Sequence, residues 1–407
     1  MSDKLRILVI SSTYPRHEDD YAVPWMREAH RRIMERGHEV TVLAPAYKGL
    51  KSHEIDGAKV KRFRYAPASM ETLTHEQGAP LKVRRVGKQL LAIPYILSGC
   101  IAAAFAVLFR RYDVIHVHWP FPHGLMGQVA RLFSGAPLVI MSHGAEFALA
   151  RRKKWIRPFL RQSLRAADLR IANSSDTASH VTGVSGKHCE VLPYGTTVSA
   201  AESNSSTNEV PRVLFTGRLI ERKGVEYLLR AVPLVLEKQK AKFVITGSGE
   251  QKERLEKIHE ELGLGDTTEF LGFVSNEQLA EEYAKCDVWV NPAIVDAWGD
   301  AEGLGVGSIE AYAYRKPVIA TNTGGIPDTI RHGETGYLVG EKDPEALAGA
   351  ILDLIQDPFK ARVFGWAGLR FARQAFSWDR ITENLEELYV QALPESRRSE
   401  LKESVAA

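Results

Sequence analysis

The chain has 407 residues, of which 44% are hydrophobic and 25% charged, an ordinary composition for a soluble protein. This length favours two domains, each with enough apolar residues for a core of its own. The cysteines Cys100, Cys189 and Cys286 lie far apart among apolar or small neighbours, with no CxxC or Cys/His spacing typical of metal ligands. They predict reduced core thiols in a cytoplasmic protein.

The net charge of +3 hides an asymmetry between the two halves of the chain. Residues 1–200 contain 29 Lys and Arg against 16 Asp and Glu, a net charge of +13, whereas the remainder has 24 against 34, a net charge of −10. A basic half favours an anionic partner such as a membrane surface, a phosphorylated acceptor or a nucleic acid. No nucleic-acid-binding motif is present, so we expect no nucleic acid partner.

The N-terminal segment has the pattern of a βαβ unit. Its apolar run is only about five residues long and lacks a small-residue cleavage site, so it predicts a first strand and no export. Strands are expected at Arg6–Ser11 and Glu39–Leu43, with a helix from about Val23 to Arg36 that ends at Gly37 as a left-handed cap. The loop between them carries Glu18, Asp19 and Asp20, which we interpret as solvated carboxylates and not as a metal site.

After a region interpreted as loop-rich, a basic cluster precedes a long apolar segment. The cluster consists of Lys82, Arg84, Arg85 and Lys88, and the segment runs from Leu90 to Phe109. This segment has about the length of a bilayer span. However, a strand of the same sheet follows it directly, so we predict one or two domain helices in place of a transmembrane helix.

A second βαβ unit is expected from Asp113 to Ser142. Its strands are Asp113–His118 and Pro137–Ser142, joined by a helix through Gly124–Ser134. The second strand ends at His143, where doubly wound sheets place their ligands.

The rest of the first domain offers weaker signals. His116 and His118 alternate on a strand and are interpreted as structural residues or, at most, as cleft lining. The basic run Arg151–Lys154 with Arg157 is either a solvated face or an anion-binding surface. Strands Asp168–Asn173 and Cys189–Pro193 complete the domain.

A Ser-rich stretch predicts a linker at 201–210, after which a second sheet begins. Its first strand, Val213–Thr216, leads into Gly217-Arg218-Leu219-Ile220-Glu221-Arg222-Lys223-Gly224 and a helix from Val225. A guanidinium and an ammonium at a strand end suit a pyrophosphate, so Arg218 and Lys223 are candidate ligand-binding residues. We interpret Arg222 as a surface charge.

The strand Asp287–Asn291 leads into the most informative stretch, residues 296–325. A glycine-rich loop precedes a helix from about Val306 to Tyr314 and a buried strand Pro317–Ala320. Backbone amides in such a loop and at a helix start can bind a phosphate. Two carboxylates, Glu302 and Glu310, lie eight residues apart across the helix start.

The Glu302 and Glu310 spacing, followed by EAYAYRKPVIATNTGGIPDTI and HGETGYLV, resembles the signature of retaining, nucleotide-sugar-dependent glycosyltransferases of family 4; GRLIERKG matches that family's phosphate-binding loop. The resemblance implies an α/β GT-B fold, two Rossmann-like domains with parallel sheets facing across a cleft. The expected domains are an acceptor-side domain at 1–200 and a nucleotide-sugar-binding domain at 211–375. A final helix at 376–394 is expected to return to the first domain.

The resemblance also implies the site. In the family the first Glu faces the donor sugar and the second binds the ribose hydroxyls, and those positions are Glu302 and Glu310. The other residues it implies are His143 near the sugar, Arg218 and Lys223 on the diphosphate, the amides of Gly303, Leu304 and Gly305, and Phe273 beside the base. The chain departs from the family after its first strand, where HEDDYAVP replaces the usual Gly-Gly pair.

The implied activity is retaining transfer of a hexose from a UDP- or GDP-sugar to a hydroxyl acceptor. The nucleotide sugar is the co-substrate, and no further cofactor and no metal are expected. Two acceptors stay open: a lipid-linked or cell-envelope intermediate, reached by peripheral attachment to the inner face of the membrane, and a soluble acceptor. Two alternatives also stay open: a sugar-nucleotide epimerase of the same fold, and a non-catalytic carbohydrate- or lipid-binding protein, which would bind no nucleotide.

Overall fold

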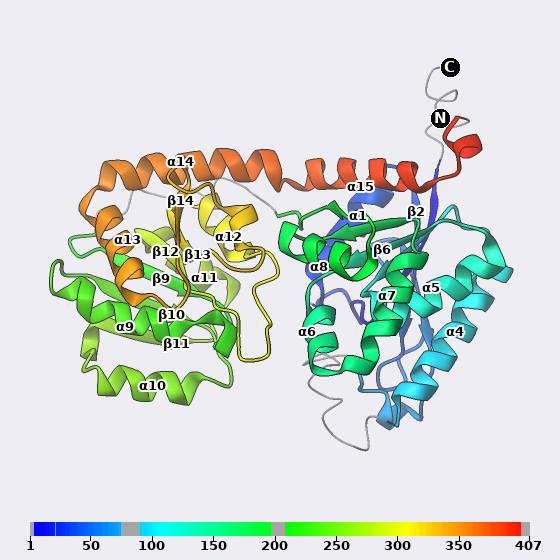
Figure 1. The fold of residues 1–407 in the computed structure, drawn as a ribbon, viewed down its shortest axis with the longest axis horizontal. Helices are drawn as coiled ribbons and strands as arrows, with labels where there is room; N and C mark the ends of the chain where they lie inside the picture. The colour runs from blue at the N-terminus through cyan, green and yellow to red at the C-terminus, as the bar shows by residue number, and fades with distance from the viewer. Residues whose placement is uncertain (1–3, 21, 75–89, 197–207, 400–407) are drawn as a thin grey trace. The chain divides into compact units, whose positions relative to one another are not determined.

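The computed structural model describes residues 4–20, 22–74, 90–196 and 208–399. The chain folds into two compact units, the first comprising Met1–Gly195 with Trp378–Ala407 and the second Thr196–Ser377 (Figure 1). Both are α/β units built on mostly parallel sheets, which confirms the predicted fold class. The predicted linker at 201–210 and the cluster at 82–88 lie wholly or largely outside the described residues.

The first unit contains an eight-stranded sheet in the order β3-β4-β2-β1-β5-β6-β7-β8. All neighbours are parallel except β3 and β4. The strands are β1 (Arg6–Ile10), β2 (Glu39–Pro45), β3 (His53–Ile55), β4 (Ala58–Phe63), β5 (Val114–His118), β6 (Leu138–Ser142), β7 (Leu169–Ala172) and β8 (Glu190–Val191).

Helices cover both faces of this sheet. Because side chains alternate along a strand, Ile7 and Val9 of β1 face one core, whereas Leu8 and Ile10 face the other. The first core includes residues of α1 (Pro24–Glu35) and α15 (Trp378–Ala392). The second includes residues of α4 (Ala92–Leu108), α5 (Pro120–Ser134), α6 (Ala145–Arg152), α7 (Arg157–Ala166) and α8 (Ser175–Ser185).

The interpretation of the region after β2 as loop-rich is wrong. Strands β3 and β4 form an antiparallel hairpin there, with the register Ile55↔Ala58. The turn residues Asp56 and Gly57 both have positive φ, at 49° and 84°. An Asp-Gly pair is a strong hairpin signal because its residues tolerate that backbone conformation. The hairpin signal was therefore present in the sequence. The lysines on the exposed face of β4 give that strand the polar composition of a loop.

The apolar segment Leu90–Phe109 forms a single helix, α4. The helix packs against α5 and against strands β2 and β4, as expected for a helix of the domain. Among the described residues, no helix is both long and apolar enough to cross a membrane.

The second unit contains a six-stranded, fully parallel sheet in the order β11-β10-β9-β12-β13-β14. Its strands are β9 (Arg212–Thr216), β10 (Lys242–Thr246), β11 (Thr268–Gly272), β12 (Val288–Asn291), β13 (Val318–Thr321) and β14 (Gly336–Val339). Its helices are α9 (Val225–Leu236), α10 (Lys252–Glu261), α11 (Asn276–Lys285), α12 (Val306–Ala313), α13 (Pro344–Gln356) and α14 (Pro358–Ala375).

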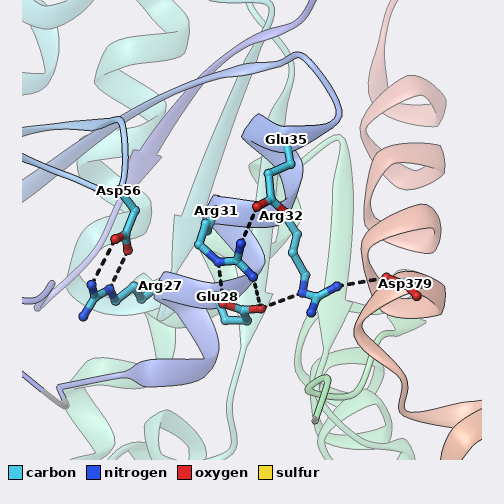
Figure 2. Close-up of polar contacts among 7 residues, drawn as sticks. All are labelled: Arg27, Glu28, Arg31, Arg32, Glu35, Asp56 and Asp379. Carbon is cyan, nitrogen blue, oxygen red and sulfur yellow. Dashed lines mark hydrogen bonds and ion pairs between the residues drawn. The ribbon is translucent and has the colours of Figure 1, made fainter. Parts of the chain in front are cut away.

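The C-terminal helix α15 belongs to the first unit and packs beside α1. Its apolar face, including Ile381 and Leu385, is buried in the core. Charged residues connect the two helices at the surface: Arg32 bonds Glu28 within α1 and reaches Asp379 of α15 at 2.9 Å (Figure 2). Exposed ion pairs contribute little to stability, so the apolar face holds α15 in place.

Candidate active site

The loop after β9 carries the two predicted diphosphate ligands. The loop passes through a short 3-10 helix, Glu221–Lys223, into α9. Arg218 is exposed, and its guanidinium makes no hydrogen bond or ion pair with any residue that the structure describes. Lys223 instead points to a protein carboxylate and is only 16% exposed. Of the two predicted diphosphate ligands, Arg218 is therefore unengaged by the described residues and Lys223 is already paired.

Glycines in the loop after β10 allow it to pack closely against the loop after β9. A Cβ on Gly247 would lie 1.8 Å from the carbonyl oxygen of Gly217, and one on Gly249 would lie 2.2 Å from that of Leu219. The amide of Leu219 also donates to the carbonyl of Ser248 at 2.9 Å. Since the two backbones approach too closely for a side chain, the position of the Arg218 loop depends on β10 and its loop.

Glu302 lies at the centre of an ion-pair cluster. Its Oε2 is 2.5 Å from Nζ of Lys223 and 2.9 Å from Nη1 of Arg222, whose Nε is 3.7 Å from Asp300. Burial alone would raise the pKa of the Glu302 carboxyl, but the Lys223 and Arg222 charges outweigh it and lower that pKa to about 2. Glu302 is therefore ionised at any physiological pH.

The interpretation of Arg222 as a surface charge is wrong. Its side chain is only 16% exposed because it turns toward Glu302. The two residues are 80 positions apart in the sequence, so no local pattern could have indicated this pair. Neighbouring charges on a loop look equivalent in a sequence, and only the fold decides which of them faces inward.

The residues Gly303, Leu304 and Gly305 lead into α12. Gly305 is the residue before the helix and has a left-handed conformation with φ of 82°, and no side chain caps the helix start. The first amides of a helix have no partner inside it, so an uncapped start suits an anionic group. The structure thus places the predicted phosphate-binding amides directly after Glu302.

Glu310 lies in the second turn of α12, on an exposed part of the helix. Its Oε2 accepts a hydrogen bond of 2.9 Å from the phenol of Tyr283, which also contacts the hydroxyl of Thr216 at 2.9 Å. Burial by surrounding protein atoms raises the pKa of the Glu310 carboxyl, although one side of the residue stays accessible. Sequence reasoning missed Tyr283, which orients this carboxylate from helix α11.

These residues gather at one edge of the second sheet. Thr216 ends β9, and β12 leads through the loop of Glu302 into α12, so both contribute from their carboxyl ends. Ligands of open parallel sheets bind at that edge. Phe273, just after β11, is 85% exposed.

His143 belongs to the first unit, where it follows β6. Its Nδ1 is 2.7 Å from the hydroxyl of Tyr194, and its Nε2 is 3.1 Å from Nδ1 of His118. Burial lowers the pKa of the His143 imidazole to about 3, so the ring is neutral. Because both ring nitrogens have protein partners, a hydrogen bond from this ring to a sugar would require one of them to break.

The remaining candidate residues from the sequence are buried or bound by neighbouring side chains. His116 and His118 are fully buried in the first unit. Asp20 of the acidic loop is bound by Nε of Arg16 at 2.6 Å. Within the described part of the chain, no group of three or more His, Cys, Asp or Glu residues is arranged to hold a metal ion.

Comparison with protein families identifies the chain. Residues 25–199 match the model described as Glycosyltransferase Family 4, and residues 199–369 match the model described as Glycosyl transferases group 1. This chain belongs to glycosyltransferase family 4. It is therefore a glycosyltransferase with the GT-B fold, an enzyme that transfers a sugar.

Two curated relatives of this glycosyltransferase have names that specify inositol compounds. A GDP-mannose-dependent alpha-(1-6)-phosphatidylinositol monomannoside mannosyltransferase of Mycobacterium tuberculosis is 26% identical over 400 residues, covering 93% of this chain and 97% of the relative. A D-inositol 3-phosphate glycosyltransferase of Streptomyces avermitilis is 31% identical over 319 residues, covering 70% and 67%.

Solved structures share the fold of this glycosyltransferase. Sucrose-phosphate synthase from Thermosynechococcus elongatus superposes with a TM-score of 0.75 at 23% identity, covering 95% of this chain and 99% of that one. Anabaena HepE in complex with UDP gives a TM-score of 0.72 at 22% identity, covering 94% and 99%.

Proposed function

We propose that this glycosyltransferase transfers a hexose, with retention of anomeric configuration, from a UDP- or GDP-sugar to a hydroxyl acceptor. The observation that carries this proposal is the contact between Lys223 and Glu302, which joins the loop after β9 to the loop before α12. It brings a cation for a phosphate beside a carboxylate for a sugar. GDP-mannose is the first donor to test because the mycobacterial relative is named for it.

In the proposed complex, the exposed Arg218 binds the diphosphate together with Lys223 and the amides of residues 303–305. Arg218 supports this role because it has no competing partner among the described residues. Glu310 accepts hydrogen bonds from the ribose hydroxyls, and its accessible side and fixed orientation by Tyr283 support that role. Phe273 borders the base and Glu302 lies toward the sugar, whereas a role of His143 at the sugar is proposed from the family resemblance alone.

The proposed reaction follows a front-face route. The bond between the anomeric carbon and the leaving phosphate oxygen breaks while the acceptor oxygen attacks from the same face. The acceptor's proton passes to that phosphate oxygen. Arg218, Lys223 and the amides before α12 stabilise the negative charge that develops on the diphosphate, which is electrostatic catalysis by preorganised groups.

We further propose that the acceptor is a lipid-linked or cell-envelope intermediate and that the enzyme works on the cytoplasmic face of the membrane as a peripheral protein. The excess of 13 positive charges in residues 1–200 supports this, since anionic lipids attract basic surfaces. The name of the mycobacterial relative, which contains phosphatidylinositol monomannoside, a lipid, points the same way.

A thermal-shift panel of nucleoside diphosphates and nucleotide sugars tests the proposed function. A ligand that binds only the folded protein raises its melting temperature by mass action. We expect a shift with UDP or GDP and with the matching sugar nucleotide. If no nucleotide shifts the melting temperature, the proposed UDP- or GDP-sugar donor is wrong. The anomeric configuration of the product, read by NMR, then tests retention.

Glu310→Ala should weaken binding of the preferred nucleotide by about 2 kcal/mol or more, the scale of a charge-assisted hydrogen bond. Burial raises the pKa of this carboxyl, so it takes up its proton at a higher pH than an ordinary glutamate when the pH is lowered. Nucleotide affinity should therefore begin to fall at that higher pH. Calorimetry of a folded variant measures the change, with Glu310→Gln to separate charge from shape. Unchanged affinity would remove Glu310 from the site.

Transfer should continue in the presence of a chelator. Two side chains, Arg218 and Lys223, supply positive charge to the diphosphate without a divalent ion. Turnover is measured before and after addition of chelator. Loss of turnover that magnesium or manganese restores would contradict this prediction and make the acidic loop at residues 18–20 the first place to look.

A further inference from the structure

The helices α4, α5, α7 and α8 of the first unit pack in that order as one layer, and a basic groove lies at the α7 and α8 end of this layer. Its volume is about 990 Å³, and its lining comes from α6, α7, α8 and the segment between α6 and α7. Most of the polar lining is cationic, with Gln162 and His180 beside the cations, and the rest of the lining is apolar. The cations are Arg151, Lys154, Arg157, Arg161 and Arg165, and the apolar lining includes Phe147, Leu160 and Val184.

The cations of α7 are held together at a cost to the helix. Arg157, Arg161 and Arg165 recur every four residues and therefore share one face, and like charges at this spacing destabilise a helix. None of the three forms an ion pair with a carboxylate in the described part of the chain. Carbonyl oxygens anchor two of them: that of Ala150 accepts from Arg157 at 3.2 Å and that of Ser185 from Arg165 at 3.0 Å.

The charged residues of α6, α7 and the segment between them are almost entirely positive, and on α8 the carboxylate of Asp176 lies 3.5 Å from Nδ1 of His180. Residues 145–166 contain seven Lys and Arg and one acidic residue, Glu146. Glu146 is only 4% exposed, and its Oε1 accepts a hydrogen bond from the amide of His143 at 2.9 Å, so it does not neutralise the groove. An anion is the complementary ligand.

An apolar ridge follows α4 in the same helix layer. We use "apolar ridge" for Ile93, Leu97, Ile101, Phe105 and Leu108, which lie three or four residues apart on a helix without charged residues. Each is between 55% and 64% exposed. The neighbouring helix α5 adds Leu132, 79% exposed, and Phe133, 53% exposed. An exposed apolar surface of this extent marks an interaction site.

Aromatic side chains lie between the ridge and the groove. Trp155 and Phe159 are 61% and 51% exposed, and both contact Phe121 of α5, with ring centroids 5.9 Å and 6.2 Å apart. Helices α4, α5, α7 and α8 pack in that order against one core, so their exposed side chains face away from the sheet. Aromatic residues beside cations and aliphatic side chains are typical of surfaces at the membrane interface.

We propose that this face of the first unit docks on an anionic phospholipid bilayer, with the apolar ridge in the acyl-chain boundary and the basic groove around a lipid phosphate. A second copy of the chain fits less well, because a symmetric interface would bring the same cations together. The purpose of this docking surface rests on the proposed action on a membrane-bound acceptor. Vesicle binding tests the surface without a measurement of sugar transfer.

The test is flotation of the full-length protein with vesicles of phosphatidylglycerol and phosphatidylcholine, and with phosphatidylcholine alone, across a salt series. We expect binding to the anionic vesicles at low salt that weakens as salt rises. Lys154→Glu with Arg161→Glu should lower the partition coefficient at least tenfold. The matched control, Lys238→Glu with Lys240→Glu, makes the same charge change at exposed sites of the second unit and should change it less than twofold.

A second pair tests the apolar ridge. Ile101→Gln with Phe105→Gln should lower partition at least tenfold, whereas Phe359→Gln with Val363→Gln, at exposed apolar sites of α14, should not. The proposal would be overturned if the wild type did not bind anionic vesicles at low salt. It would also be overturned if both control pairs lowered the partition coefficient as strongly as the test pairs. A dimer in sedimentation without vesicles that the ridge pair dissociates would overturn it as well, as would groove-dependent stabilisation by inorganic phosphate without vesicle binding. If the nucleotide thermal shift persists in all variants, their loss of vesicle binding does not come from damage to the donor site.

Discussion

Arg218→Ala should lower kcat/KM for sugar transfer by about 10²–10³-fold, the usual effect of removing one preorganised group that stabilises a developing charge. The guanidinium lies at the end of β9, in the loop that leads to Lys223, and it is exposed. Lys223 shares its charge with Glu302, so Arg218 is the cation with its full charge available for a diphosphate. Its loss should therefore weaken both donor binding and the stabilisation of the leaving group.

This variant is well suited to a kinetic test. Arg218 has no hydrogen-bond or ion-pair partner for its side chain among the described residues, so truncation should leave the melting temperature of the free enzyme unchanged. The matched control is Arg362→Ala on α14, which removes an exposed arginine outside the site. Steady-state kinetics with the preferred donor measure both. If Arg218→Ala transfers sugar as fast as Arg362→Ala, the phosphate-binding role of the loop is wrong.

Gly247→Ala should destabilise the second unit by about 2–5 kcal/mol, because it adds overpacking to a strained backbone conformation. Gly247 has φ of 117°, which side-chain-bearing residues rarely adopt. Its Cβ would lie 1.8 Å from the carbonyl oxygen of Gly217, a backbone atom that cannot move without displacing Arg218. Nucleotide affinity should therefore fall together with stability.

Gly349→Ala is the control for this substitution. Gly349 lies inside α13, and its Cβ would meet nothing within 4 Å. Alanine there should raise stability by about 0.5–1 kcal/mol, since it restricts the unfolded chain without straining the helix. Urea denaturation compares the two variants. Equal stability of Gly247→Ala and the wild type would show that the loops after β9 and β10 separate easily, contrary to the packing described.

Much of the local structure around the candidate site was predictable from local patterns. The strand, loop and helix around Arg218 and Lys223, and the glycine-rich stretch from Glu302 to Glu310, lie where periodicity and glycine placement predict them. These features depend on residues close together in the sequence, and a local pattern is enough to predict them. The roles that the family resemblance assigns to these residues stay predictions, for which the experiments above are the test.

The pairing of side chains could not be read in this way. Arg222 and Lys223 are neighbours with equivalent charge, yet both turn toward a carboxylate about 80 residues away. The hydrogen bond from Tyr283 to Glu310 and the contacts that occupy both ring nitrogens of His143 also join separate elements. Long-range contacts of this kind follow from how strands and helices pack, which short-range propensity does not specify.

The sequence by itself determined the two α/β units, the order of most of their elements and the family to which the chain belongs. Alternating and helical apolar periods, together with glycines where the backbone turns, are sufficient for the units and their elements. The family follows from the resemblance of the motifs at residues 217–224 and 302–325 to those of known glycosyltransferases. Only the tertiary structure decided that the arginines of α7 line one groove and that an uncharged helix leaves an apolar ridge exposed. A sequence shows which side chains are apolar or charged, but their exposure depends on what the rest of the chain covers.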